Sequence, residues 1–276
     1  MKNLHLPLED WTNSFVNEWL LPELGDFFNQ LSDGIELIVD GVTDGLLIVP
    51  PFLLTFIVVV LSFWLAGKGV GLFSLAGCIY LGAVDLWPEA MQTVAIVIVA
   101  TLLSVIIGVP LGIISAKNRF MNQLTRPVLD FMQTLPSFVY LIPAILLFGL
   151  GGVPAVISTF IFATPPAVRM TNLGIRQVPE DIVEASKAFG STTWQMLFKV
   201  ELPMSLQTIM AGVNQTIMLA LSMAVISSMI GAPGLGSTVL SGISNVNVGL
   251  GLTGGLGIVV LAIIIDRLTQ GIGDKL

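Results

Sequence analysis

The chain has 276 residues, of which 54% are hydrophobic and only 11% are charged, and its formal net charge is −7. In a soluble globular protein about 25% of the residues are charged. So few ions exclude an ordinary soluble protein, whose surface needs charge to stay in solution, and they predict an integral membrane protein. We expect membrane lipid, and no nucleic acid, among its partners.

Cysteine and histidine are too scarce to build a disulfide framework or a metal site. Cys78 is the only cysteine and His5 the only histidine, so cysteine-based and histidine-based clusters are excluded. We expect Cys78 to be a small packing residue, because it lies in an apolar run. The start, MKNLHLPLED, has no basic and then apolar signal region, so no cleaved signal peptide is expected.

The first 44 residues differ from the rest of the chain because they are rich in acids. Trp11, Phe15 and Trp19 are four residues apart, so they would share one face of a helix. We expect residues 1–44 to form an acidic, amphipathic arm outside the cytoplasm, either at the membrane surface or packed on protein. A solvated helix is the third alternative. The nine acids are Glu9, Asp10, Glu18, Glu23, Asp26, Asp33, Glu36, Asp40 and Asp44.

Seven apolar segments are candidates for helices that cross a bilayer, which takes about 20 residues. The second and fifth are the weakest, because they are short and rich in Gly or Pro. The pattern predicts an all-α, polytopic membrane bundle, with two peripheral helices in 45–88 and a core of five helices in 89–276. The segments are approximately 46–66, 70–87, 90–115, 128–149, 152–169, 206–230 and 249–267.

The distribution of Lys and Arg predicts the orientation. If the C-terminus is cytoplasmic, ten of the eleven basic residues lie on the cytoplasmic side and only Lys2 lies outside. Cytoplasmic loops of membrane proteins carry such an excess of basic residues. We therefore expect the N-terminus outside and the C-terminus in the cytoplasm. The longest cytoplasmic loop is then 170–205.

Glycine motifs in the chain do not predict a nucleotide site. No G-x-x-x-x-G-K-[ST] sequence occurs, so the chain is not expected to bind ATP through a phosphate-binding loop. The run 249–254 matches G-x-G-x-x-G but follows no strand. We interpret its glycines, and the pair Gly108 and Gly112, as positions of close helix packing. Pro110 between that pair predicts a kink.

No ionisable residue falls in the middle of an expected span; Asp130, Arg169 and Asp266 are among those near the ends. Proton- and ion-coupled carriers usually need charges inside the membrane, although Na⁺ sites made of backbone carbonyls would escape this test. An intramembrane hydrolase is also disfavoured, because no His or mid-span acid could activate a Ser or Thr. Helix-breaking Gly and Pro residues cluster from the fourth span onward. They indicate either a pathway or irregular helix ends.

The long cytoplasmic loop has its own pattern. Pro-Glu-Asp at 179–181 favours the start of a helix. Ile182, Ala185 and Phe189 would share one face of that helix, and Gly190 would end it and permit close approach of another backbone. A Leu-Pro pair would end the loop just before the sixth span. These residues leave two alternatives, a docking knob under the membrane or a helix packed on its own bundle.

The loop resembles the EAA loop of binding-protein-dependent ABC importer permeases. That loop reads E-A-A, then Gly four residues on, then I-x-L-P; Ser for the second Ala keeps the side chain short. Segments 133–179, 210–231 and 261–270 resemble the glycine betaine/proline betaine permeases of osmoprotectant importers, and the resemblance covers about 85–272. The loop residues that match are Glu184, Ala185, Ser186, Gly190, Leu202 and Pro203.

The resemblance implies a type I ABC importer permease fold in a bacterial cytoplasmic membrane, without a catalytic or metal site. In that family two identical permease subunits work with two cytoplasmic ATPases, which bind ATP and Mg²⁺, and with an extracytoplasmic substrate-binding protein. The EAA loop forms the coupling helix seated in a groove of the ATPase. Phe138, Tyr140 and Phe148 could line a weak transient site for a quaternary ammonium group, with ordinary packing as the alternative.

Two other functions stay open at this point. One is a secondary carrier or channel that acts without an ATPase. The EAA loop discriminates between this function and an ABC importer permease. The other is a membrane assembly or receptor subunit whose acidic arm is the functional part.

Overall fold

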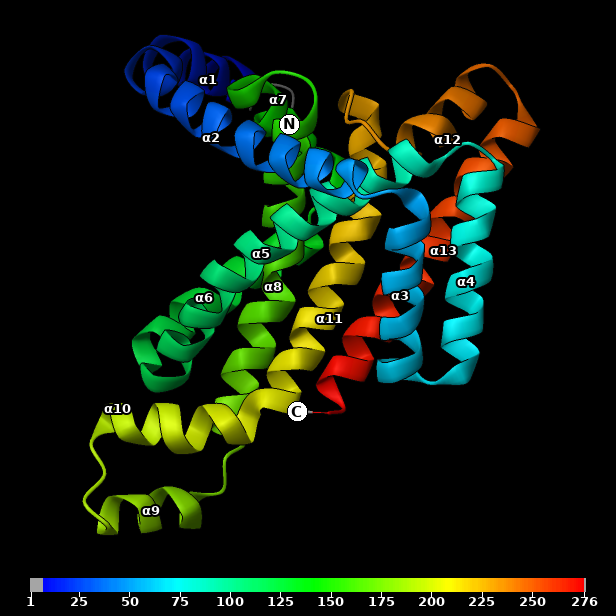
Figure 1. Cartoon of the computed structure of the whole chain (residues 1–276). Coiled ribbons are helices and arrows are strands. Elements are labelled where there is room, and N and C mark those ends of the chain that lie inside the picture. The colour runs from blue at the N-terminus through cyan, green and yellow to red at the C-terminus, as the bar shows by residue number, and fades with distance from the viewer. Residues whose placement is uncertain (1–6, 276) are drawn as a thin grey trace, which may run out of the picture.

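The structure, a computed structural model, describes residues 7–275, so Lys2 and His5 lie outside the described residues. Helices make up nearly all of that part, and no strand occurs in it (Figure 1). The helices, with π- and 3₁₀-helical stretches marked η, are α1 (Leu8–Ser14), η1 (Phe15–Leu20), α2 (Leu21–Ile48), α3 (Pro51–Ala66), α4 (Lys68–Ala83), α5 (Trp87–Lys117), α6 (Arg119–Thr134), η2 (Ser137–Tyr140), α7 (Leu141–Phe148), α8 (Gly152–Arg176), α9 (Glu180–Ala188), α10 (Thr193–Met196), η3 (Leu197–Glu201), α11 (Leu202–Ile226), η4 (Ser227–Ile230), α12 (Leu235–Ser244) and α13 (Val248–Gly273).

Helices α5, α8 and α11 form the centre of the bundle. Two glycines of α5 allow α8 to approach closely. A Cβ atom on Gly108 would lie 2.9 Å from the Cβ of Ala167, and one on Gly112 would lie 2.7 Å from the carbonyl oxygen of Val168. Any larger residue would push the helices apart. The expected packing role of this glycine pair is therefore confirmed, and α5 continues through Pro110 as one helix.

The glycines of the run 249–254 also serve packing. A Cβ on Gly254 would lie 3.0 Å from a methyl group of Val239, and one on Gly242 of α12 would lie 2.5 Å from the backbone nitrogen of Gly251. Helix α12, which the sequence pattern did not predict, folds back on α13 through these contacts (Figure 1). Cys78 is buried in a core cluster with Leu81 and Leu261, as its apolar surroundings suggested.

Two of the expected spans have different shapes from those predicted. The first does not begin at residue 46, because α2 continues to Ile48 and the chain then turns by 96° into α3. The fourth is not one straight helix over 128–149. Its α6 half begins at Arg119, and the chain bends by 107° before η2 and α7. Leu135 is extended (φ −67°, ψ 134°) because the proline that follows it disfavours helical backbone there.

Among residues 7–275, four single helices are long and apolar enough to cross a membrane, and the number rises to six if each bent pair counts as one span. Helix α4, with 16 residues, falls below that length. The count of seven therefore stays a prediction. The polytopic helical bundle itself agrees with the sequence pattern.

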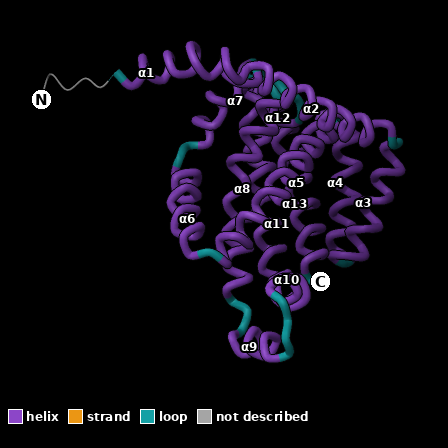
Figure 2. Tube along the Cα trace, turned by 90° about the vertical axis from the view of Figure 1, so that its left-hand side faces the viewer, coloured by secondary structure: helices purple, strands orange, loops and turns teal. Residues whose placement is uncertain are grey.

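The N-terminal arm is helical from Leu8 to Ile48. It runs across one end of the bundle, and α9 projects from the opposite end (Figures 1 and 2). Ile35 and Val39 fix the arm by packing in a core cluster that includes Ile96 and Val153. The side chains of Trp11, Phe15 and Trp19 remain exposed. The amphipathic character of the arm and its location outside the cytoplasm both stay expectations.

Candidate functional site

Helix α9 carries the residues that resemble the EAA loop, and it stands apart from the bundle (Figure 2). It has no buried residue, and the side chain of Phe189 at its end is 92% exposed. Glu180 and Asp181 lie in its first turn and Lys187 in its last, which places each charge at the helix end that favours it. The structure therefore shows a helix that projects from the bundle and is not packed on it, and a docking role for this helix stays a prediction.

Gly190 ends this helix in a left-handed conformation, with φ +81°. Its backbone N–H donates to the carbonyl of Lys187 at 2.9 Å, and the N–H of Ser191 donates to the carbonyl of Ser186 at 3.2 Å. Such a helix end favours glycine because a Cβ atom strains this backbone conformation. A Cβ here would meet nothing within 4 Å, so space for close approach is open on the outside.

The second half of the loop corrects one expectation. Leu202 and Pro203 do not end the loop before a separate span, because α10, η3, α11 and η4 form one helix of 38 residues from Thr193 to Ile230. A capping box between Thr192 and Gln195 starts it. The π-helical turn η3 ends at Glu201, two residues before Pro203, and such a wide turn accommodates a proline ring.

Exposed aromatic rings follow the cap on this helix. Trp194 and Phe198 stack with ring centroids 5.8 Å apart, and both side chains are largely exposed. Together with Phe189 they give the projecting loop an apolar surface with no partner among the described residues. Exposed aromatic groups of this kind mark interaction surfaces.

The base of the loop is tied to the end of α5. The Nζ of Lys117 donates to Oε1 of Glu201 at 2.5 Å, and the Glu201 side chain is only 4% exposed. The Arg176 guanidinium, at the end of α8, donates to the carbonyl of Ser115 at 3.1 Å. Both ends of the loop thus leave the bundle at one polar junction. Sequence reasoning missed this junction, although an acid such as Glu201 in an apolar segment is a signal for it.

The face between α6 and α8 is polar and carries a second ion pair. Arg169 donates to Oδ1 of Asp130 at 2.5 Å, and Asn172 donates to Asn122 at 3.2 Å. A cavity of about 440 Å³ adjoins these residues. Because α6 begins at Arg119 and α8 ends at Arg176, both charges lie further inside their helices than the sequence pattern suggested.

The three aromatic residues proposed for a pathway are not brought together. Tyr140 is buried, its hydroxyl donates to the carbonyl of Met132, and its ring contacts Phe162 edge-on at 5.9 Å. Phe148 contacts Phe28 of the arm at 5.6 Å, and Phe138 is exposed. No aromatic pair within residues 7–275 joins two of the three. Their role in a pathway stays a prediction.

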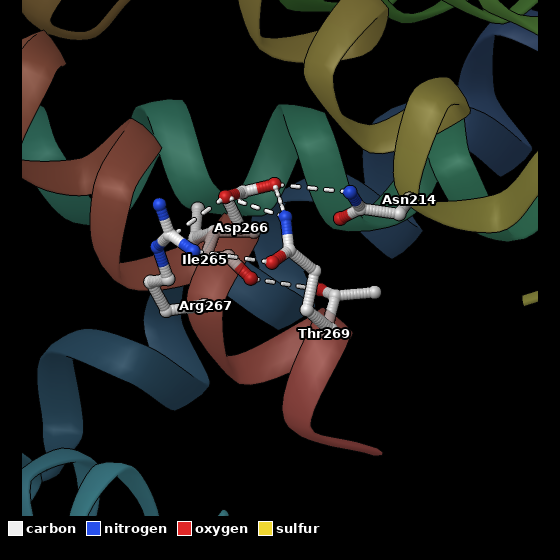
Figure 3. Close-up of polar contacts among 6 residues, drawn as sticks. Asn214, Ile265, Asp266, Arg267 and Thr269 are labelled. Carbon is white, nitrogen blue, oxygen red and sulfur yellow. Dashed lines mark hydrogen bonds and ion pairs between the residues drawn. The ribbon is translucent and has the colours of Figure 1, made fainter. Parts of the chain in front are cut away.

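A third polar cluster joins α11 to α13 (Figure 3). Asn214 donates to Oδ1 of Asp266 at 3.0 Å, and the side-chain amide of Gln270 donates to both carboxylate oxygens at 2.8 Å. These residues belong to segments 210–231 and 261–270, so part of the family resemblance reflects a structural link. Within the described residues, no group of three or more His, Cys, Asp or Glu side chains could hold a metal ion.

A helical membrane bundle with a free loop at one end, and with no phosphate-binding sequence, has the design of a permease, the transmembrane component of a multi-subunit transporter. The chain belongs to the family described as the binding-protein-dependent transport system inner membrane component, whose model matches residues 108–276. The family resemblance drawn from the loop is therefore confirmed.

Relatives and a solved structure agree with this assignment. The chain is 46% identical over 270 residues to the glycine betaine transport system permease protein OpuAB of Bacillus subtilis (strain 168), which covers 98% of this chain and 95% of that one. It is 47% identical over 274 residues to the glycine betaine/carnitine transport permease protein GbuB of Listeria monocytogenes (serotype 1/2a, strain 10403S), covering 98% and 96%. The inward-facing MetNI methionine ABC transporter matches with a TM-score of 0.58 at 24% identity, over 66% of this chain and 90% of that one. That match confirms the fold of an ABC importer permease.

Proposed function

We propose that the protein is the transmembrane subunit of an ATP-driven importer and forms the translocation pathway for glycine betaine or related quaternary ammonium solutes. The observation that carries this proposal is the free α9, which presents Glu184 to Gly190 outside the bundle with no buried residue. The printed functions of OpuAB and GbuB supply the substrate class.

Energy reaches the bundle from partner subunits. Two ATPases bind ATP and Mg²⁺, and the coupling helix α9, with Glu184, Ala185 and Ser186 in the helix and Gly190 directly after its C-cap, sits in a groove of one of them. Closure of the ATPase pair displaces α9. The Lys117–Glu201 ion pair and the Arg176–Ser115 hydrogen bond then transmit this movement to α5, α8 and α11, because rigid helices joined at one junction move together.

The remaining partners follow from the orientation. Lys187 and Lys199 lie on the projecting loop, whereas the acids of the arm lie on the opposite end of the bundle. This arrangement supports a cytoplasmic loop and C-terminus in a bacterial cytoplasmic membrane, with the arm outside. An extracytoplasmic substrate-binding protein delivers the solute on the arm side, and a second copy of this chain completes the pathway.

Reconstitution tests the proposal. The chain is placed in proteoliposomes with its ATPase and binding protein, and uptake of labelled glycine betaine is measured with ATP inside. We expect uptake that requires ATP and the binding protein and that does not respond to ion gradients. Uptake that follows a Na⁺ or proton gradient without ATP would overturn the proposal in favour of a secondary carrier.

A further inference from the structure

We propose that Asp130 and Arg169 form a transient binding site for a zwitterionic solute, on the face between α6 and α8. The inference rests on the proposed function and names where the solute touches this chain. The two residues face each other across the helix pair, with the Arg169 guanidinium 2.5 Å from Oδ1 of Asp130. The adjoining cavity has a volume of about 440 Å³, and Asn122, Arg126, Asn172 and Arg176 also line it, together with apolar residues such as Leu129 and Met170.

The exposure of this pair shows what the face borders. The side chain of Arg169 is 41% exposed and that of Asp130 is 68% exposed. Asp130 lies one turn before the end of α6 at Thr134, and Arg169 lies about two turns before the end of α8 at Arg176. Charges on helices of a membrane bundle are costly against lipid and are found facing water-filled cavities or protein. The face therefore borders an aqueous pathway or the second subunit of the transporter.

Helix α6 supports the same conclusion along its length. Gln123, Arg126, Asp130 and Gln133 are exposed and recur at spacings of three and four, so they form one stripe. A separate exposed stripe is apolar and holds Phe120, Leu124, Val128 and Phe131. A helix with one polar and one apolar exposed stripe fits the boundary between a water-filled path and lipid.

The charges match the chemistry of a betaine. Such a solute carries a carboxylate and a quaternary ammonium group on one small molecule. A guanidinium binds a carboxylate through two parallel hydrogen bonds, and the Asp130 carboxylate attracts the ammonium group. The solute carboxylate takes the place of Asp130 on Arg169, and Asp130 turns to the ammonium group. When the solute leaves, the ion pair forms again.

Weak binding suits this position. An exposed ion pair contributes little to stability, so separating it for the solute costs little. Passage through a pathway needs a site that binds enough to admit the solute and releases it readily. Arg126 at the cavity adds a second positive charge for the carboxylate end. The tight binding that selects the solute stays with the substrate-binding protein.

Thiol labelling of the complete permease–ATPase complex, without nucleotide or binding protein, tests the inference. In a Cys78→Ser background, Leu173→Cys reports on the cavity that Leu173 lines, and Gln123→Cys, exposed on α6 but outside the lining, is the matched control. Increasing concentrations of glycine betaine are expected to slow labelling at Leu173→Cys along a saturation curve that gives the apparent Kd of the cavity. At twice that Kd the labelling rate should be about one-third of the rate without solute, which is the free fraction of a single site. Sucrose at the same osmolality is expected to have no effect.

Adding Asp130→Asn or Arg169→Gln is expected to abolish this protection, while the complex still elutes intact with its ATPase. Protection that persists in both variants, or equal slowing at Gln123→Cys or by sucrose, would overturn the site. A labelling rate that changes with the phosphatidylglycerol content of the membrane, and does not change with glycine betaine, would also overturn the site and assign the cavity to anionic lipid. ATP-driven uptake by the unsubstituted complex is measured in parallel. Uptake without protection overturns only this site, whereas absence of uptake overturns the proposed function.

Discussion

Lys117, at the last position of α5, and Glu201, at the last position of η3, form an ion pair across 84 residues of sequence, with Nζ to Oε1 at 2.5 Å. The pair is asymmetric, because the Lys117 side chain is 33% exposed and the Glu201 side chain only 4%. The two ends therefore respond differently to loss of the partner. Water can solvate an orphaned Lys117, but it cannot reach an orphaned Glu201.

We predict that Lys117→Met destabilises the protein more than Glu201→Gln. Lys117→Met leaves a buried carboxylate without its cation, at a cost of about 3–5 kcal/mol. Glu201→Gln leaves a partly exposed ammonium and costs about 1 kcal/mol. The midpoint of thermal unfolding of the purified complex gives the comparison, and the double variant should recover most of the loss. If Glu201→Gln lowered the midpoint as much as Lys117→Met or more, the burial of Glu201 would not be what determines the contribution of the pair to stability.

The coupling assignment predicts that Gly190→Arg leaves the protein in the membrane but abolishes ATP-driven uptake, because the side chain blocks docking. Gly67→Arg is the matched control. Gly67 joins α3 to α4, also has a positive φ (+88°, against +81° at Gly190), and a Cβ at either position meets nothing within 4 Å. The strain at Gly67 is the more severe test, because its ψ of 179° belongs to a backbone region that essentially only glycine adopts, so normal uptake with Gly67→Arg would show that backbone strain alone does not abolish transport. Normal uptake with Gly190→Arg in membrane vesicles would refute the role of α9.

The sequence predicted the helix in the long loop and its end at Gly190 because the signals are local: acids at a helix start, apolar residues at helical spacing, and a glycine at the end. It left open whether this helix projects from the bundle or packs on it. The bends at Pro50 and Pro136 were not predicted, because hydropathy continues through both and only packing shows that the chain turns. The partners of Lys117 and Asp130 are also non-local. Charges far apart in sequence give no pattern by which to match them, so the junction and the polar face emerged only from the fold.

Packing of α5 on α8 predicts a position-specific cost for alanine. Gly112→Ala would place a Cβ 2.6 Å from the Cβ of Thr171. The Thr171 Cβ is held by the backbone of α8, so it cannot move aside as the end of a long side chain could. We expect a loss of about 1–3 kcal/mol in stability, as for other overpacked sites. Gly255→Ala in α13 is the control, because nothing lies within 4 Å of its Cβ. That change should be neutral or slightly stabilising, since alanine favours helix over glycine. Thermal unfolding of the two variants decides the point, and equal midpoints would contradict the close approach.

The arm predicts different results for two deletions. Removing residues 1–20 takes away exposed residues such as Trp11 and Trp19 but keeps Ile35 and Val39 in the core. We expect this variant to assemble and to take up glycine betaine at close to the normal rate. Removing residues 1–40 also removes both core residues, each of which contributes about 1.5–3 kcal/mol by burial. That variant should lose stability and assemble poorly.

A pair of point variants separates packing from charge in the longer deletion. Ile35→Ala with Val39→Ala keeps every acid of the arm and should reproduce the loss of stability, while Leu37→Ala, at a side chain that is 76% exposed, should not. Uptake and co-elution with the ATPase are the two measurements. If the deletion of residues 1–20 abolished uptake in a complex that still assembles, the distal arm would be a functional element. The alternative of a receptor or assembly subunit would then gain support, because an arm that only stabilises the bundle by packing would not affect uptake in a complex that assembles.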